Sequence, residues 1–253
     1  MHENGSITLS DVTDYIINVS KGKNPIADKK QLLNYDSVSK NIVFKLINTK
    51  WNSELLKDVP HVEFLDLSVV FQCMLAGEFK GIAAMLVHNA HMKLWDVTVD
   101  ELLEAAKKNT LQLMGCDFKS IKEVICEIIK EEVQGDFDYD MCMAGLEDSV
   151  PMYVLSNRYR VEGAACMLYP KILLDICEIL KNSFYIIPSS IHEVLILPSD
   201  NTSESREILA MIKEINDTQV SAEEILSYSL YYYDGKECKI VGADKRISGN
   251  HLA

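Results

Sequence analysis

The sequence predicts an α+β fold, in which serial β-hairpin–helix units form a mostly antiparallel sheet with helices packed on one face. Two observations lead to this prediction. Short apolar segments rich in β-branched residues occur in pairs, and each pair is followed by a segment with helical periodicity. This order occurs three times without matching side chains at fixed offsets, so the pattern repeats and the sequence does not.

The first hairpin–helix unit follows an N-terminal region that has its own expected elements. Residues 8–20 place apolar side chains on one helical face, a short helix is expected around residues 29–33, and residues 41–48 read as a strand. The unit itself consists of strands at 61–75 and 81–89.

Its helix is expected in two pieces, "AHMKLW" and "TVDELLEAAKKNTLQLM". Thr98 begins the second piece with Glu101 three residues later, which is the spacing of a capping box.

The second and third units repeat this order. "MYVLSN" and "EGAACMLY" are predicted strands before a helix that starts at Pro170, a residue suited to the first helical turn. "FYIIPSS" and "HEVLILP" are predicted strands before the helix "SESREILAMIKEIND". Two further strands, "YSLYYYDG" and "KECKIVG", are expected to close the sheet.

An amphipathic helix, "FKSIKEVICEIIKEEVQG", lies between the first two units and aligns isoleucines on one side. The acidic segment "DFDYDMCMAGLEDS" follows it and resembles a linker. The expected organisation is an N-terminal helical segment with a strand (1–60), the first unit with the amphipathic helix (61–130), an acidic connector (131–150), the second and third units with closing strands (151–241), and a flexible tail (242–253).

Composition restricts the class of protein. Apolar residues make up 48% of the 253 residues and the formal net charge is −13. Such acidity disfavours nucleic acids and anionic membrane surfaces as partners, because both attract clustered Lys and Arg. The seven cysteines form no CxxC pair or zinc spacing, which favours free thiols in a reducing compartment. Without a signal peptide or an apolar stretch of about 18 residues, we expect a cytoplasmic protein.

Three motifs carry a resemblance to a known family. "EFLDLSVVF", "YVLSN" followed by "GAACMLYP", and "PSSIHEVLILP" resemble an uncharacterised bacterial family that is defined only as a domain of unknown function. The resemblance covers about residues 40–235. It implies a soluble α+β protein with several paralogues in anaerobic gut bacteria, and it implies no particular activity.

The densest polar cluster is "PSSIHE", which contains Ser189, Ser190, His192 and Glu193. A hydroxyl, an imidazole and a carboxylate are the components of an activated nucleophile. In an extended chain, however, Glu193 points away from the other two residues. The alternative is a turn whose hydroxyl groups bond to local backbone, with His192 anchoring the next strand. We favour the turn, and as a site the cluster suits binding better than catalysis.

The stretch "YVLSNRYRVEGAACMLYP" is interpreted as a β-hairpin that runs into a helix. Asn157 suits its turn, and Arg158 and Arg160 lie at the expected exposed tip, a candidate contact surface. Cys166 sits among small apolar residues, so a buried thiol is favoured over a reactive one.

Two patterns suggest metal sites. His88 and His91 are three residues apart and need further ligands, for which His192 is one source; helix-capping histidines are the favoured alternative. Asp136, Asp138, Asp140 and Glu147 match the carboxylate spacing of an EF-hand loop. Met141 replaces the required glycine and no exit helix follows, so a connector is favoured over calcium binding.

Motifs of the common nucleotide enzymes and hydrolases, such as GxGxxG, Walker A, HExxH and GxSxG, do not occur. We therefore expect a non-enzymatic binding or adaptor module without a cofactor, whose partner is another protein or a small molecule. Asn157, Arg158, Ser189, Ser190, His192 and Glu193 are its candidate binding residues. One alternative is a hydrolase or transferase that uses Ser190 or Cys166 with His192, and a second is a metal-binding protein.

Overall fold

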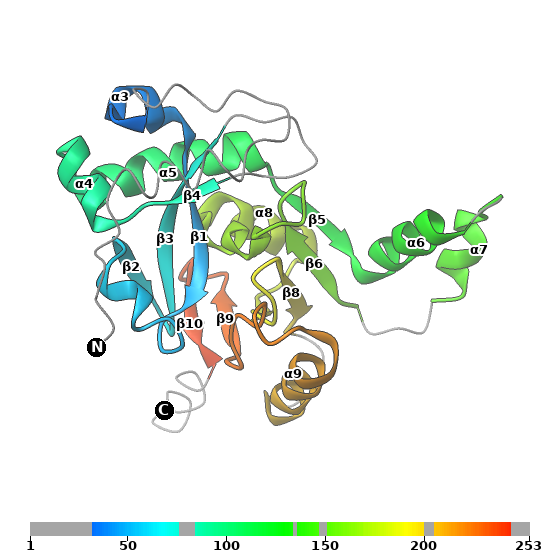
Figure 1. Cartoon of the computed structure of the whole chain (residues 1–253). Helices are drawn as coiled ribbons and strands as arrows, with labels where there is room; N and C mark the ends of the chain where they lie inside the picture. Colours follow the sequence, from blue (N-terminus) through cyan, green and yellow to red (C-terminus); the bar gives the residue numbers. More distant parts are fainter. Residues whose placement is uncertain (1–31, 76–83, 134–135, 147–150, 200–204, 244–253) are drawn as a thin grey trace, which may run out of the picture. The chain divides into compact units, whose positions relative to one another are not determined.

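The structure is a computed structural model that describes residues 32–75, 84–133, 136–146, 151–199 and 205–243 (Figure 1). Contacts between Cα atoms divide the chain into two compact subdomains. Subdomain 1 comprises residues 1–44, 54–62 and 70–110, and subdomain 2 comprises residues 45–53, 63–69 and 111–253. The boundaries fall inside the three strands at 42–48, 61–64 and 67–74 and the helix at 99–114, whose residues are shared between the subdomains.

A four-stranded sheet has the order β1-β3-β2, and β4 also pairs with β3. Its strands are β1 (Ile42–Asn48), β2 (His61–Phe64), β3 (Leu67–Met74) and β4 (Ala84–Leu86). Seven consecutive residues of β3 are buried, which explains why this strand reads as a continuous apolar run instead of alternating. The antiparallel pairing of β3 with β4 confirms the first predicted hairpin. The single strand expected over 61–75 is wrong in its extent: the chain turns at Leu65, which has a left-handed backbone, and forms the two neighbouring strands β2 and β3.

Helical elements precede, connect and follow these strands. They are α3 (Tyr35–Val38), η1 (Ser39–Asn41), η2 (Leu55–Lys57), α4 (Asn89–Trp95) and α5 (Val99–Met114). The predicted capping box before α5 is present: the Thr98 amide donates to the Glu101 carboxylate at 2.8 Å, and the Glu101 amide donates to the Thr98 hydroxyl at 3.3 Å.

Subdomain 2 contains a six-stranded sheet with the order β10-β9-β7-β8-β6-β5, and its neighbouring strands are antiparallel. Its strands are β5 (Asp117–Ser120), β6 (Tyr153–Ser156), β7 (Phe184–Ile187), β8 (Glu193–Pro198), β9 (Tyr231–Asp234) and β10 (Lys239–Gly242). The α+β class with antiparallel sheets is therefore confirmed. The third hairpin and the closing strands also form as the sequence predicts.

The core of subdomain 2 lies against both faces of this sheet, since adjacent residues of β7 and β8 are buried. Helix α9 (Ser205–Gln219) packs Ile208 and Ile212 against Ile187 and Leu197 on one face. Helix α8 (Pro170–Leu180) buries its own apolar residues and has Pro170 in its first turn, as predicted.

The prediction that "EGAACMLY" forms a strand is wrong. Residues Gly163–Leu168 form a 3-10 helix, η3, so β6 has no hairpin partner after it. The reason is positional: β6 is already paired with β5 on one side and with β8 on the other, and a strand has only two edges. The sequence reading also missed β5, which the amphipathic helix pattern obscured.

Helices α6 (Ile121–Glu132) and α7 (Tyr139–Ala144) lie together at the β5 end of this sheet (Figure 1). A disulfide between Cys126 and Cys142 joins them, with 6.0 Å between the two Cα atoms. We call the described residues of 121–146 the arm. The segment 131–150, which the sequence presents as an acidic connector, thus contributes a helix that is bonded covalently to α6.

Some expectations concern residues outside the described ranges: the helices at 8–20 and 29–33 (apart from its last two residues), Glu147, and nearly all of the C-terminal tail. Within the described ranges, none of the helices is long and apolar enough to cross a bilayer.

Candidate functional site

The loop after β6 is organised by the buried side chain of Asn157. Its Oδ1 accepts hydrogen bonds from the amides of Tyr159 (3.0 Å) and Val161 (3.4 Å), and its Nδ2 donates to the Val161 carbonyl at 2.7 Å. The loop contains two non-glycine residues with left-handed backbone, Arg160 and Glu162. Asn157 therefore stabilises a loop in which Arg160 and Glu162 adopt backbone conformations that non-glycine residues disfavour.

Arg158 is exposed, as the sequence predicts, and part of it packs against a neighbouring segment. Its amide donates to the Met114 carbonyl at 3.1 Å, and its side chain lies over Gly115, where an added Cβ would be 2.3 Å from Nε. Gly115 has a φ of +68°, so glycine suits this position for its backbone as well as for its space.

Ser189 and Ser190 are buried in the corner between β7 and β8. The Ser190 hydroxyl accepts from the His192 amide at 2.9 Å, and the Ser189 carbonyl accepts from the Leu226 amide at 3.0 Å. Ser190 also forms an isolated bridge with Ile225. These contacts agree with the interpretation of "PSSIHE" as a turn.

The His192 ring uses both of its nitrogens within the fold. Nδ1 accepts from the Glu162 amide at 3.2 Å, and Nε2 lies 3.3 Å from the Glu224 carboxylate. Glu162 in turn accepts from the Lys45 ammonium at 2.5 Å. Since a backbone amide can only donate, Nδ1 is the unprotonated nitrogen and His192 serves as a structural link between two loops.

Gly163 closes this arrangement, which we call the polar corner (residues 156–163 and 188–193). A Cβ at this position would be 2.2 Å from the Ser156 hydroxyl and 2.6 Å from both the Asn157 amide and the His192 carbonyl. The same Ser156 hydroxyl donates to the His192 carbonyl at 2.7 Å. The backbone of η3 therefore lies directly against β6 and the start of β8.

Glu193 is the corner residue whose proton affinity is perturbed. Burial raises the pKa of its carboxyl, and the nearby His192 and Arg160 oppose that rise. Glu193 pairs across the sheet with Ser156, so the two side chains share a face. A half-buried carboxyl with a raised pKa does not by itself define a reaction.

The geometry needed for the enzymatic alternative does not form within the described residues. The His192 ring contacts neither the Ser190 hydroxyl nor the Cys166 thiol, because its nitrogens bond to Glu162 and Glu224. Cys166 is buried, and its Sγ lies 3.8 Å from the Gly115 carbonyl. A hydrogen bond with Cys116, together with burial, raises the pKa of the Cys166 thiol far above its ordinary range.

The histidines of α4 are caps, as the favoured interpretation predicts. The His88 amide donates to His91 Nδ1 at 2.9 Å, and the His91 ring stacks on Trp95. Burial, followed by the nearby His88, lowers the pKa of His91 to about 4. His88 itself pairs with Asp58 at 2.8 Å.

The EF-hand pattern does not form a calcium loop in the residues that the structure describes. Asp138 caps α7 by accepting from the Met141 amide at 3.0 Å, and Asp140 and Met141 lie inside that helix. Across the described ranges, moreover, His, Cys, Asp and Glu side chains form no group of three or more that could hold a metal ion.

A second polar cluster surrounds Asp66, between β2 and β3. Its carboxylate accepts from the hydroxyls of Ser227 (2.6 Å), Ser229 (3.0 Å) and Tyr231. Burial and the hydrogen bond to Asp66 raise the pKa of Tyr231. The donors converge on the carboxylate, so this cluster ties β9 to the loop that contains Asp66 and leaves no group aimed at a ligand.

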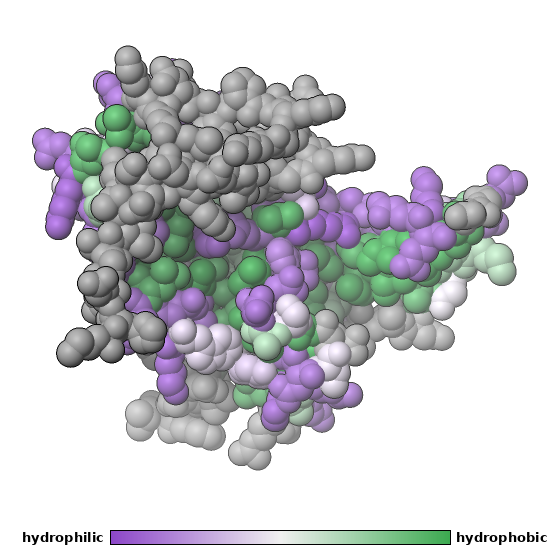
Figure 2. Space-filling view, in the orientation of Figure 1, coloured by the Kyte–Doolittle hydropathy of each residue, from purple (hydrophilic) through white to green (hydrophobic). Residues whose placement is uncertain are grey.

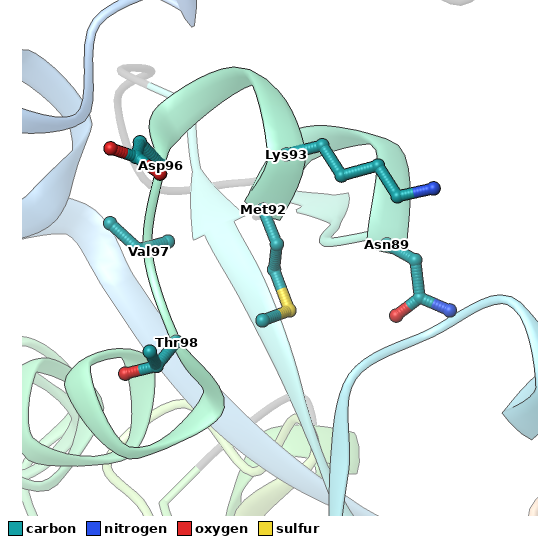
Figure 3. A pocket seen from close by; sticks show the side chains of 6 residues that line it. All are labelled: Asn89, Met92, Lys93, Asp96, Val97 and Thr98. Atoms are coloured by element: carbon teal, nitrogen blue, oxygen red, sulfur yellow. The ribbon is translucent and has the colours of Figure 1, made fainter.

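Subdomain 1 has a hollow of about 480 Å³ beside α4 (Figure 3). It is lined by Asn89, Met92, Lys93, Asp96, Val97 and Thr98. Figure 3 shows these side chains spread along α4 and the loop that follows it. Asn89 and Thr98 already bond to Lys57 and Glu101, respectively. The hollow therefore has few groups available to orient a small molecule.

The arm differs from these regions because its apolar side chains are exposed. Figure 2 shows a hydrophobic surface along α6 and α7. Met141 is 75% exposed and Ile128 is 47% exposed. The large exposed apolar residues of the arm are Ile128, Ile129, Val133, Tyr139 and Met141. Contiguous apolar surface of this kind marks an interaction site more often than scattered single residues do.

Acidic side chains surround this apolar surface. The exposed ones are Glu131, Glu132, Asp136, Asp138 and Asp140, against one exposed lysine among the described arm residues, Lys130. The arm thus presents apolar contact area within a negative field.

An ion network fixes the base of the arm to the sheet. Glu127 on α6 accepts from Lys119 on β5 at 2.6 Å and from Arg160 in the loop after β6 at 2.9 Å. Lys119 also lies 3.4 Å from Asp117. The hydrogen bond from Lys119, with the charge of Arg160, lowers the pKa of Glu127, and the same bond raises the pKa of Lys119. The loop that Asn157 organises therefore supports α6.

Sequence reasoning identified the polar corner and missed the arm. One signal was present: the apolar stripe of α6 continues to Ile129, beyond the part of the helix that the sheet buries. The expectation of free thiols is wrong for Cys126 and Cys142, which form a disulfide, and holds for the other five cysteines. The pair could not be foreseen, because a spacing of 16 residues matches no common cysteine motif.

Comparison with known proteins adds a family. The model of a family of unknown function, DUF5688, matches residues 1–235. The chain belongs to this family. The match extends past the motifs at 63–71, 153–170 and 188–198 to the start of the chain. Among curated proteins and solved structures, none matches the chain.

Proposed function

We propose that this DUF5688 member is a protein-binding module that uses the arm to hold a basic, amphipathic helical segment of its partner. The observation that supports the proposal is the exposed apolar surface of α6 and α7. The two short helices lie side by side and present an apolar surface against which a third, amphipathic helix can pack. The polar corner then serves as the support that positions α6.

Charge supports a basic partner. The five exposed carboxylates of the arm favour lysines and arginines on the partner and disfavour acidic segments. The net charge of −13 extends the same preference over the whole chain and argues against nucleic acids. We further propose a cytoplasmic location, which the five free cysteines favour.

A non-enzymatic role is part of the proposal. It is supported by the engagement of both His192 nitrogens, by the burial of Ser190 and Cys166, and by the capping role of His91. The candidate residues of the polar corner act within the fold, so we assign partner contact to Ile128, Tyr139 and Met141 instead.

Binding to a fluorescent synthetic Leu/Lys amphipathic helix tests the proposal directly. We expect saturable binding that weakens with salt, and a loss of about tenfold or more in affinity for Ile128→Glu or Met141→Glu, because a charge is placed in a desolvated contact. The matched control is Ile179→Glu, which alters an exposed isoleucine of α8 outside the arm.

A Leu/Glu helix of the same length is the control for charge. Equal binding of both peptides, or unchanged affinity in the two arm variants, would overturn the proposal. Dimerisation in solution that Ile128→Glu abolishes would also overturn it, because the occupant of the arm would then be a second copy of the chain.

A further inference from the structure

We propose that the Cys126–Cys142 disulfide is a redox switch of the arm: when it is oxidised it holds α7 on α6, and its reduction releases α7. The consequence for partner binding rests on the function proposed above. The release of α7 on reduction does not rest on the proposed function, because it involves no partner.

The weakness of α7 is the first support. It has six residues and no buried side chain. An isolated helix of this length does not form stably in water. Its Asp138 cap bonds within the helix itself and therefore gives no attachment to α6. The covalent bond from Cys142 to Cys126 supplies that attachment.

The two sulfurs differ in accessibility, and this difference sets the order of the reaction. Cys126 is fully buried, whereas Cys142 is partly exposed. A thiolate of a small dithiol reductant attacks the Cys142 sulfur, the disulfide breaks, and Cys126 leaves as a thiolate. The second thiolate of the reductant then attacks the reductant's other sulfur, which is bonded to Cys142 in the mixed disulfide, and Cys142 is released as a thiolate. The reductant ends as a cyclic disulfide, and two electrons have moved to the protein.

Subdomain 2 contains a matched comparison in the pair Cys116 and Cys166. These thiols are also in contact, through a hydrogen bond, yet they are free. They lie beside β5 and in η3, respectively, where the sheet and the polar corner hold both segments without a covalent bond. The Cys126–Cys142 disulfide therefore lies where the fold supplies few other interactions to hold the two joined helices together. In a reducing compartment a disulfide of this kind is typically transient or redox-sensing.

Hydrogen exchange measured by mass spectrometry on the whole protein tests the switch, with and without dithiothreitol. We expect exchange in residues 139–144 to become about tenfold faster or more on reduction, with β7 and β8 unchanged. The double variant C126S/C142S should match the reduced protein without any reductant. The variant C116S/C166S is the control and should keep the oxidised pattern and its response to dithiothreitol.

Unchanged exchange in α7 after alkylation has confirmed reduction would overturn the switch. So would a C126S/C142S variant that protects α7 as the wild type does. The Leu/Lys peptide then separates the two proposals. Faster exchange with unchanged peptide affinity keeps the switch and contradicts its link to binding, whereas absent peptide binding in both states contradicts the proposed function alone.

Discussion

The polar corner is attached to the inner strands β6, β7 and β8, the arm follows the edge strand β5 of the same sheet, and the two regions are stabilised in opposite ways. In the corner, Asn157 and Ser190 bond to backbone groups, and His192 bonds to a backbone amide and to Glu224. Gly163 packs too closely to admit a side chain. In the arm, α7 has no buried side chain and apolar residues such as Met141 face solvent.

This contrast shows that a dense polar motif is not by itself a site. Buried polar groups need partners, so the residues that resemble catalytic ones can all be engaged in holding loops together. Exposed apolar groups have no such structural explanation, and they are the better guide to contact with a partner.

The largest expected effect tests whether the corner is as tightly packed as the contacts indicate. Gly163→Ala should lower the free energy of unfolding by about 3 kcal/mol or more, because the new methyl would overlap the Ser156 hydroxyl and two backbone atoms. Denaturant unfolding measures the change. Gly242→Ala is the control, since a Cβ there meets nothing within 4 Å. Equal stability of the two variants would mean that the polar corner can rearrange to accommodate the added methyl group.

A smaller effect tests the role of His192. His192→Ala should cost about 1–3 kcal/mol of stability, because the Glu162 amide loses its acceptor and Glu224 loses its partner. A fall in melting temperature is the expected result, and Lys171→Ala, which removes an exposed pair with Asp175, should change it little. A neutral or stabilising His192→Ala would instead mark the corner as a functional site held at some cost to stability.

The smallest effect concerns the ion network that joins the two regions. The pKa of Glu127 is lowered in the folded protein, so its contribution to stability is present above the ordinary value of 4.5 and is lost as the pH falls through the folded value below it. Because Glu127 is substantially exposed, we expect less than about 1 kcal/mol.

Thermal unfolding of the wild type and Glu127→Gln checks this sign. The wild type should be slightly more stable at pH 6, and the two curves should converge as the pH falls below the folded pKa of Glu127 and the carboxylate is protonated. A difference that stays constant with pH would show that packing by this side chain, and not its charge, supports α6.

The sequence alone determined the elements whose signals are local. The alternating and continuous apolar patterns located β1, β3, β7, β8 and the closing strands, and the Thr98–Glu101 box and Pro170 marked helix starts. These signals depend on residues a few positions apart, and such residues interact in the same way in any fold. They were sufficient for the α+β class.

Tertiary structure decided the rest, because it depends on which segments compete for the same neighbour. "EGAACMLY" could not pair with β6 once β5 and β8 had taken both of its edges, so it became η3. The six predicted site residues differ: the side chains of Asn157, Ser190 and His192 bond within the fold, Ser189 is buried, Arg158 is exposed, and Glu193 is a half-buried carboxyl with a raised pKa. The exposure of Ile128 and the bond between Cys126 and Cys142 likewise depend on where the sheet ends, since burial and distance between remote residues are set only when the chain has packed.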